Sequence, residues 1–452
     1  MIPLTSLKAI AYSFTPSIVH PFLNRIKDSE IGSRMARGIF WSIVGSVISR
    51  CLMLCATVLV ARILGKTVYG ELGMIQSTVG MFGVFAGFGL GMTATKYVAE
   101  FRRSDPARTG RIIGLSGLFA IGTGGLIALG LLIFAPWLAE HTINAPHLSG
   151  VLRIGAIILF INALNGSQTG ALSGFEAFKT IAYINFFIGL ISFPILICGA
   201  YFGGLTGAVW GIAVNLCFNW LLNHMALRKE ARRYLVPFTI QNCSREWSVL
   251  WKFSFPAALS GIVAVPINWA CGALLVNQHG GYAEMGIFSA ANQWRNMILF
   301  IPGMLGQVIL PLLSNLNGES RGQQYRKILL MNVFLNAGIA LSVVFPLVLA
   351  ADFIMSTYGP GFEKGASVLR ILSFSAVLSA ANSVVGQAIS SKDRMWLGFT
   401  FNALWAIALL ATASILLQKG YGALGLAYGT FIAYALHTVW QGSYFIVALN
   451  QK

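Results

Sequence analysis

Apolar residues fill most of this chain in long segments, and short polar stretches separate them. Twelve of these segments reach about 20 residues, the length at which an α-helix crosses the hydrocarbon core of a bilayer. Their approximate bounds are 38–63, 70–94, 112–136, 148–172, 178–202, 204–227, 250–275, 285–313, 327–351, 364–390, 395–417 and 421–446. The pattern predicts an all-α polytopic membrane protein with twelve transmembrane helices.

The composition strengthens this prediction. Hydrophobic residues make up 56% of the chain and charged residues 10%, whereas roughly 25% of the residues of a soluble domain are charged. The net charge of +17 would suggest nucleic acid in a soluble protein, but the positions of the charges give it another meaning. With the N-terminus in the cytoplasm, most of the 31 Lys and Arg residues fall in cytoplasmic segments. We therefore predict that both termini are cytoplasmic and that nucleic acid is not a partner.

The second half of the chain repeats the first at an offset of about 217 residues. Val-Leu-Arg-Ile occurs at 151–154 and again at 368–371, and the same offset places Asn165 on Asn382. Six spans return the chain to its starting side, so the two repeats have parallel topology and we expect a central cavity between them.

The repeat divides the chain into four predicted parts. They are a cytoplasmic N-terminal segment at 1–37, a six-helix bundle at 38–227, a solvated cytoplasmic linker at 228–249 and a second six-helix bundle at 250–447.

Four arginines lie inside predicted spans, namely Arg50, Arg153, Arg295 and Arg370. An arginine at a helix centre costs roughly 2.5–3.5 kcal/mol even on the lenient insertion scale. None of the 14 carboxylates of the sequence lies beside them at membrane depth in this pattern. Unpaired positive charge at this depth predicts an anionic ligand.

Arg50 and Arg295 fall near the middle of the first and eighth spans, each on or beside a stripe of polar residues. Ser46 lies one helical turn before Arg50, and Asn292 and Asn296 flank Arg295. We regard these five residues as candidate ligand contacts. In the alternative interpretation, the two arginines hydrogen-bond backbone carbonyls that prolines of the seventh and eighth spans leave free.

Arg153 and Arg370 are different, because each lies only about five residues from the outer end of its span. A long cationic side chain at that depth can extend to the interface. This symmetric pair is predicted either to contact the ligand or to anchor the helices to structure and lipid.

Two further patterns concern packing and bending. Four glycines follow one face of the second span and predict close helix packing there: Gly80, Gly83, Gly87 and Gly91. Four prolines concentrate in the seventh and eighth spans and predict bends: Pro256, Pro266, Pro302 and Pro311.

Several classes of chemistry lack their motifs in this sequence. No nucleotide-binding loop is present, no metal-ligand or disulfide spacing is visible among the six cysteines, and no Asp or Glu falls mid-span. The external loops are too short for a catalytic domain. We expect no cofactor, no metal and no enzymatic activity.

Several motifs carry a resemblance to a known family. They are Ala-Arg-Ile-Leu-Gly-Lys-Thr-Val-Tyr-Gly at 61–70, Gly-Phe-Gly-Leu-Gly at 87–91, the two Val-Leu-Arg-Ile copies, Phe-Ser-Phe-Pro at 253–256 and Ile-Leu-Pro-Leu-Leu-Ser at 309–314. With them the chain resembles bacterial polysaccharide transporters, specifically O-antigen-type flippases of lipid-linked oligosaccharides. That family belongs to the multidrug, oligosaccharidyl-lipid and polysaccharide exporter superfamily.

The resemblance implies that an undecaprenyl-diphosphate-linked glycan is moved from the cytoplasmic to the periplasmic leaflet by alternating access. It implies a place in the bacterial inner membrane, a role in O-antigen, lipopolysaccharide or related surface polysaccharide synthesis, and a polysaccharide polymerase among the partners of a monomer. Relatives use cationic residues on the first and eighth helices, and Arg50 and Arg295 match those positions.

Three alternatives remain at this point. A multidrug and toxin extrusion antiporter has a similar helix plan, although a cation extruder should offer buried carboxylates. A membrane glycan ligase or polymerase would act on the same lipid-linked donor, but it would favour a large periplasmic loop. A purely structural subunit would not explain four arginines at membrane depth.

Overall fold

The computed structural model of the chain describes residues 30–87, 89–237, 242–247, 254, 263–306, 322–392 and 394–450. Across these residues the structure consists of helices joined by turns, without a strand. The predicted N-terminal segment, the predicted linker and the start of the predicted seventh span lie partly outside the described residues.

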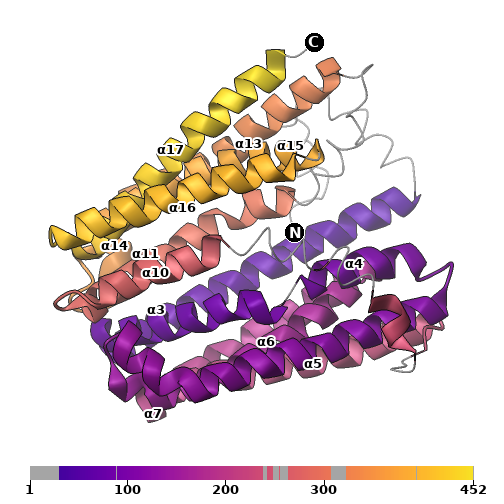
Figure 1. The fold of residues 1–452 in the computed structure, drawn as a ribbon, viewed down its shortest axis with the longest axis horizontal. Helices are drawn as coiled ribbons and strands as arrows, with labels where there is room; N and C mark the ends of the chain where they lie inside the picture. The colour runs from indigo at the N-terminus through magenta and orange to yellow at the C-terminus, as the bar shows by residue number, and fades with distance from the viewer. Residues whose placement is uncertain are drawn as a thin grey trace, which may run out of the picture.

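The helices follow one another in antiparallel fashion (Figure 1). The long ones are α3 (Glu30–Gly87), α5 (Pro106–Trp137), α6 (Ser149–Gly174), α7 (Phe178–Arg233), α13 (Gly322–Leu349), α15 (Gly365–Ser391), α16 (Met395–Gln418) and α17 (Gly422–Asn450). The shorter ones are α4 (Leu90–Phe101), η1 (Leu138–Thr142), η2 (Pro146–Leu148), η3 (Cys243–Glu246), α10 (Ala264–Val276), α11 (Gly281–Ile298) and α14 (Ala351–Thr357). Within the described residues, the eight long helices have the length and apolar composition to cross a membrane, which confirms the all-α polytopic class.

Helix α3 contains a reversal of the chain at Gly65. This residue has φ 74° and ψ 166°, a conformation that glycine adopts without steric cost. Thr57 and Gln76, on either side of it, line the same cavity, although a straight helix would separate them by about 28 Å. The predicted boundary between the first two spans therefore falls at Gly65, and Figure 1 shows α3 running to one end of the molecule and back.

Helix α7 reverses in the same way at Gly204, which has φ 54° and ψ −136°. The two arms pack closely, because a Cβ on Gly207 would lie 2.0 Å from the carbonyl oxygen of Gly199. Only glycine permits this approach. The predicted boundary between the fifth and sixth spans lies at this turn.

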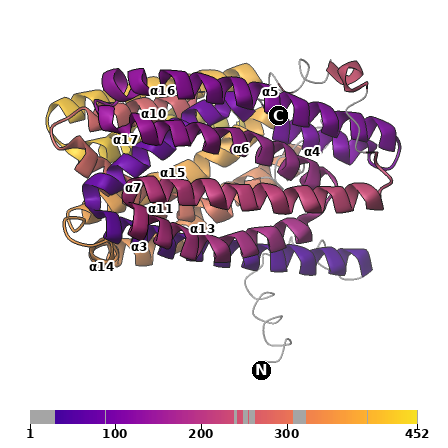
Figure 2. The same ribbon diagram turned by 90° about the horizontal axis from the view of Figure 1, so that it is seen from below.

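Both views place α14 and the turn of α3 at one end of the molecule, and α4 at the other (Figures 1 and 2). We call these the α14 end and the α4 end. The charge pattern predicts that the α14 end is periplasmic, and that orientation stays a prediction, as does the division into two six-helix bundles.

One pair of contacts supports the internal repeat. The amide Nδ2 of Asn165 donates to the carbonyl oxygen of Leu216 at 3.2 Å, and Nδ2 of Asn382 donates to that of Tyr434 at 3.4 Å. The offset of about 217 that relates the two asparagines also relates their acceptors to within one residue.

A close backbone contact between the two halves joins α3 to α11. A Cβ on Gly70 would lie 1.8 Å from the carbonyl oxygen of Tyr282, and one on Gly286 would lie 2.0 Å from that of Lys66. Small residues allow membrane helices to approach until their backbones touch. This contact holds the second arm of α3 against the helix that carries Arg295.

The predicted glycine ridge of the second span is corrected. Hypothetical Cβ atoms on Gly80, Gly83 and Gly87 would meet no described atom within 4 Å, whereas one on Gly91 would touch Gly166. Gly80 lines the cavity instead. The close packing that the sequence predicted for this helix occurs at Gly70, on the side that faces α11.

The proline prediction is confirmed at one position. The helical path is interrupted at Leu299, between α11 and residues 300–306, and Pro302 has no N–H to donate to the carbonyl of Ile298. Pro266 instead occupies the first turn of α10, where proline is tolerated. Pro256 and Pro311 lie outside the described residues.

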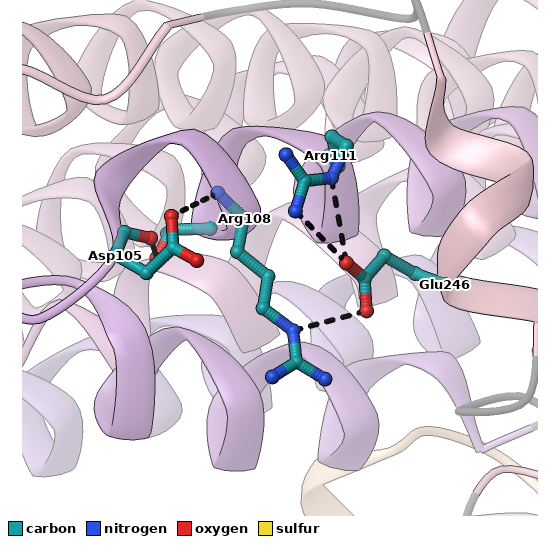
Figure 3. A network of polar contacts seen from close by, with 5 residues as sticks. Asp105, Arg108, Arg111 and Glu246 are labelled. Carbon is teal, nitrogen blue, oxygen red and sulfur yellow. Dashed lines mark hydrogen bonds and ion pairs between the residues drawn. The ribbon is translucent and has the colours of Figure 1, made fainter.

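The connection between the two predicted bundles is only partly solvated, since Arg228, Lys229 and Arg232 are exposed whereas Glu230 and Glu246 are buried. Residues 228–233 continue α7, and Glu246 of η3 is buried between two arginines of α5 (Figure 3). Its Oε2 accepts from Nε of Arg108 at 3.1 Å and its Oε1 from Nη2 of Arg111 at 3.2 Å, while Asp105 caps α5 through the backbone N–H of Arg108. These bonds attach the connection between the halves to the first half.

We expect Gly70→Ala to destabilise the protein by about 1–3 kcal/mol, because the added Cβ forces α3 away from Tyr282. Gly83→Ala on the same arm of α3 is the matched control, since its Cβ would enter open space and alanine favours a helix. Thermal unfolding in detergent measures both. Equal melting temperatures for the two variants would contradict the assignment of this contact.

Candidate functional site

A cavity of about 500 Å³ lies between the two halves of the chain. Both arms of α3 and both arms of α7 line one side of it, and α10, α11 and α17 line the other. Its polar lining consists of hydroxyl and amide groups and one cation: Thr57, Tyr69, Gln76, Ser77, Asn268, Ser289, Asn292, Gln293, Arg295, Asn296 and Thr430. No described carboxylate belongs to the lining, so the cavity carries a positive charge.

Arg295 supplies that charge from the last turn of α11. Its Nε donates to the hydroxyl of Ser375 on α15 at 3.1 Å, and its guanidinium lies over the ring of Tyr434 on α17, 5.1 Å from the centroid. Its Nη2 is buried and has no hydrogen-bond partner within the described part of the chain. The guanidinium therefore keeps donor capacity for a ligand in the cavity.

Arg50 does not line this cavity. Its guanidinium lies over the ring of Phe300, 4.0 Å from the centroid, and its side chain is exposed. Phe300 follows Arg295 by five residues, about 7 Å along the helix toward the α4 end. The structure thus brings the two predicted cations to one wall between the halves, with Arg50 nearer the α4 end and Arg295 deeper.

The candidate residues beside these two arginines also differ in position. Asn292 and Asn296 line the cavity beside Arg295. Ser46 lies in α3 one helical turn before Arg50, and the structure does not describe its side chain.

Arg153 and Arg370 lie outside the cavity lining. Arg370 forms an ion pair with Asp352 of α14 and donates to the carbonyl oxygen of Val348 at 3.4 Å. The expectation that no carboxylate would accompany the four arginines is therefore wrong for Arg370, because α14 folds back toward α15. Arg153 on α6 is exposed.

Four aromatic residues pack together at the α14 end of the cavity, and we call Tyr69, Trp294, Tyr358 and Phe362 the aromatic cluster. Nε1 of Trp294 donates to the hydroxyl of Tyr358 at 3.0 Å, and the ring centroids of Tyr69 and Phe362 are 6.1 Å apart. Tyr358 and Phe362 have no exposed surface. They come from the connection between α14 and α15, so a segment of the second half covers α3 of the first.

Sequence reasoning missed the aromatic cluster and Ser375. Ser375 lies 80 residues from Arg295, and no spacing rule links them. A signal for the cluster existed in Tyr358 and Phe362, since two large aromatic residues in a short external connection require burial.

The fold and the cavity define a polytopic membrane protein with a positively charged cavity between its two halves. The chain belongs to the polysaccharide biosynthesis protein family, whose model matches residues 35–317. This confirms the resemblance seen in the sequence motifs.

Two curated relatives cover most of their own length in the comparison. The EPS I polysaccharide export inner membrane protein EpsE of Ralstonia nicotianae is 22% identical over 88% of this chain and 90% of the relative. The lipid III flippase of Escherichia coli K12 is 22% identical over 62% of this chain and 68% of the relative. Both relatives are named for transport rather than for a catalysed reaction.

A solved structure shares the fold. An inward-facing multidrug resistance transporter of the MATE family, in the MOP superfamily, superposes with a TM-score of 0.73 at 13% identity, over 89% of this chain and 96% of that one. A drug transporter and relatives named for polysaccharide export and lipid flipping thus share one architecture. The fold alone does not select the cargo, and the chemistry of the cavity must do so.

We expect the aromatic cluster to be the barrier at the α14 end. The starting protein lacks its six cysteines and carries Ser289→Cys. In it, Tyr358→Ala should raise the rate at which a water-soluble maleimide labels this cysteine several-fold, because the substitution removes a ring packed against Tyr69. Phe353→Ala is the control, since Phe353 of α14 is 73% exposed. Identical labelling rates in the two variants would show that the barrier lies elsewhere.

Proposed function

We propose that this protein flips an undecaprenyl-diphosphate-linked oligosaccharide from the cytoplasmic to the periplasmic leaflet, for the synthesis of O-antigen or a related surface polysaccharide. The observation that carries the proposal is the guanidinium of Arg295, which lines a cavity whose described lining holds no carboxylate and which has one nitrogen without a partner among the described residues. The family and the names of the two relatives support the same class of cargo.

The diphosphate is the part of such a substrate that needs a cation. A charged group that leaves water loses its hydration, and a guanidinium compensates by donating parallel hydrogen bonds to phosphate oxygens. Arg50, nearer the α4 end, is positioned to meet the diphosphate first, and Arg295 to hold it deeper. Ser46 lies one turn from Arg50 on the approach.

The sugars require a different surface. Asn292, Asn296, Gln76 and Asn268 offer amide groups along the cavity wall, and each can both donate to and accept from a hydroxyl group. The polyprenyl chain would stay in the lipid beside the helices, because removing it from hydrocarbon into water costs about 0.8 kcal/mol for each CH₂ group.

Alternating access fits the distribution of contacts between the halves. The aromatic cluster, the Gly70–Gly286 contact and the bond from Tyr282 to the carbonyl of Ile143 all lie toward the α14 end. This arrangement corresponds to a state closed at the predicted periplasmic side. Release at that side requires these contacts to separate. In this proposal the twelve spans form two bundles, which rock against each other.

Two competing functions account less well for the same observations. A cation-extruding antiporter needs a carboxylate in the cavity, and the described lining has none. A glycan ligase or polymerase needs a catalytic loop, whereas the described external connections are short helices packed on the bundle. In this proposal the protein acts as a monomer in the inner membrane. Both of its termini are cytoplasmic, and a polysaccharide polymerase is a functional partner.

The test reconstitutes the protein in liposomes with an undecaprenyl-diphosphate-linked oligosaccharide and follows exposure of the glycan on the opposite leaflet. We expect Arg295→Ala and Arg50→Ala each to reduce the flipping rate at least about tenfold, since a lost charge-assisted hydrogen bond costs roughly 1.5–3 kcal/mol. Arg295→Lys should give an intermediate rate, because it keeps the charge without the planar fork.

Arg103→Ala is the control, because Arg103 is exposed in the turn between α4 and α5. Normal flipping by both arginine-to-alanine variants would refute the site. Absence of flipping by the wild-type protein across a panel of lipid-linked glycans would refute the function.

A further inference from the structure

One face of α17 carries a row of buried and half-buried polar side chains that extends from the cavity toward the α4 end. It consists of Thr430, Tyr434, His437, Gln441 and Tyr444, spaced by alternating four and three residues. Thr430 lines the cavity, and Tyr444 lies about 21 Å farther along the helix. We call this row the α17 polar face.

The α17 polar face lies among groups from three other helices. Asn382 of α15 donates to Thr438 at 3.0 Å and to the carbonyl oxygen of Tyr434, and Trp405 of α16 has its ring 5.4 Å from that of Tyr434. At its two ends lie cations, Arg295 of α11 over the ring of Tyr434 and Arg394 over the ring of Tyr444.

Unpaired polar atoms concentrate along this face. Within the described residues, all but one of the buried side-chain atoms without a hydrogen-bond partner belong to the second half of the chain. They include His437 Nδ1, Gln441 Oε1, the Tyr444 hydroxyl, Trp405 Nε1, Trp440 Nε1 and Gln387 Oε1. Buried polar atoms are almost always paired in proteins, so a group of exceptions in one place needs a functional explanation.

The set has the chemistry of a proton path. The two indoles donate, the two amide oxygens accept, and His437 and Tyr444 can do either. His437 is 5% exposed and Gln441 is 4% exposed, so bulk solvent does not satisfy them. Histidine is the side chain best suited to exchange a proton near neutral pH, although burial of the ring disfavours its charged form.

The corresponding region of the first half is paired. The offset of about 217 places Trp220 at the position of His437 and His224 at that of Gln441. There Asn223 donates to Asn219 at 2.8 Å and to Asn165 at 3.4 Å, and His224 stacks on Trp220. The unpaired polar face is therefore a property of the second half and not of the repeat.

We propose that His437 is a proton-binding site coupled, through Tyr434, to anion binding at Arg295. The ring of Tyr434 lies 6.5 Å from that of His437 and 5.1 Å from the Arg295 guanidinium, so the two cations are near neighbours across one aromatic ring. The other titratable or charged groups around His437 are Tyr444 on α17, Tyr325 of α13 beyond it and two cations, Arg394 over the ring of Tyr444 and Lys392 over the ring of Tyr325. The described faces of α15 and α16 contribute amides and aromatic rings.

The sign of the coupling follows from charge. No ion pair in the described structure joins a carboxylate to Arg295 or His437, so protonated His437 and Arg295 repel each other. An anion that neutralises Arg295 removes this repulsion and favours the proton. Because coupling between sites is reciprocal, a proton on His437 must strengthen anion binding.

The coupling rests on the proposed function, whereas the proton site does not, so the experiment measures the two separately. Binding of farnesyl diphosphate to the detergent-solubilised full chain is measured at pH 8 and at pH 5.5 in wild type and in His437→Gln. We expect the wild-type affinity to gain about fivefold or more over His437→Gln at the lower pH. The probe's own titration cancels in that ratio.

His224→Gln is the matched control and should keep the wild-type pH dependence. The proton site is read independently from tryptophan fluorescence, because a protonated imidazole quenches the indole of Trp440, whose ring lies 6.0 Å from His437. Trp137 and Trp220 also stack on histidines, so part of the acid quenching persists in every variant. Wild type should show an additional part that both His437→Gln and Trp440→Phe remove.

Three results would overturn the proposal or part of it. Identical pH dependence of binding in wild type and His437→Gln would exclude the coupling. Acid quenching of the same size in wild type and His437→Gln would exclude the proton site. Failure of wild type to bind farnesyl diphosphate at either pH, with the quenching intact, would count against the anion site of the proposed function and against the coupling, and would leave the proton site established.

Discussion

A guanidinium inside a membrane protein must find acceptors for its N–H groups, and Arg295 is only partly provided for. One hydroxyl, that of Ser375, and one aromatic face, that of Tyr434, hold it from α15 and α17. One nitrogen remains buried and unpaired. The placement of α11 against α3, the composition of the cavity and the polar face of α17 are all organised around this cation. A complete set of protein acceptors would have made Arg295 a structural residue.

The two halves of the chain descend from one pattern but are no longer equivalent. The Asn165 and Asn382 contacts preserve the repeat in three dimensions. Around them, the first half pairs most of its buried polar groups and fixes the inter-half connection through Glu246, while the second half holds Arg295 and all but one of the unpaired buried polar atoms among the described residues. In the proposed mechanism, the first half supplies the entry cation and the second half the deeper one.

Particular residues show how far the sequence predicts the site. Arg50, Arg295, Asn292 and Asn296 were identifiable because a charge or amide in an apolar segment is costly and therefore informative. Asp352 and Glu246 were not, because each meets its arginine only after a short helix folds back on the bundle. The prediction of a glycine packing ridge was wrong for a related reason. Gly80 and Gly83 have the spacing of a packing face, but that face is turned toward the cavity and open space rather than toward a helix.

The sequence by itself determined the number and length of the apolar segments, the glycines at which they turn and the presence of cations at depth. Lipid is a uniform solvent, so the length of an apolar run and the cost of a charge follow from composition alone. Only the tertiary structure decided which face of each helix meets its neighbour. Membrane helices are apolar toward lipid and toward protein alike, so hydropathy does not encode their rotation. Backbone contacts such as that of Gly70 with α11 fix it instead, and with it the residues that surround Arg295.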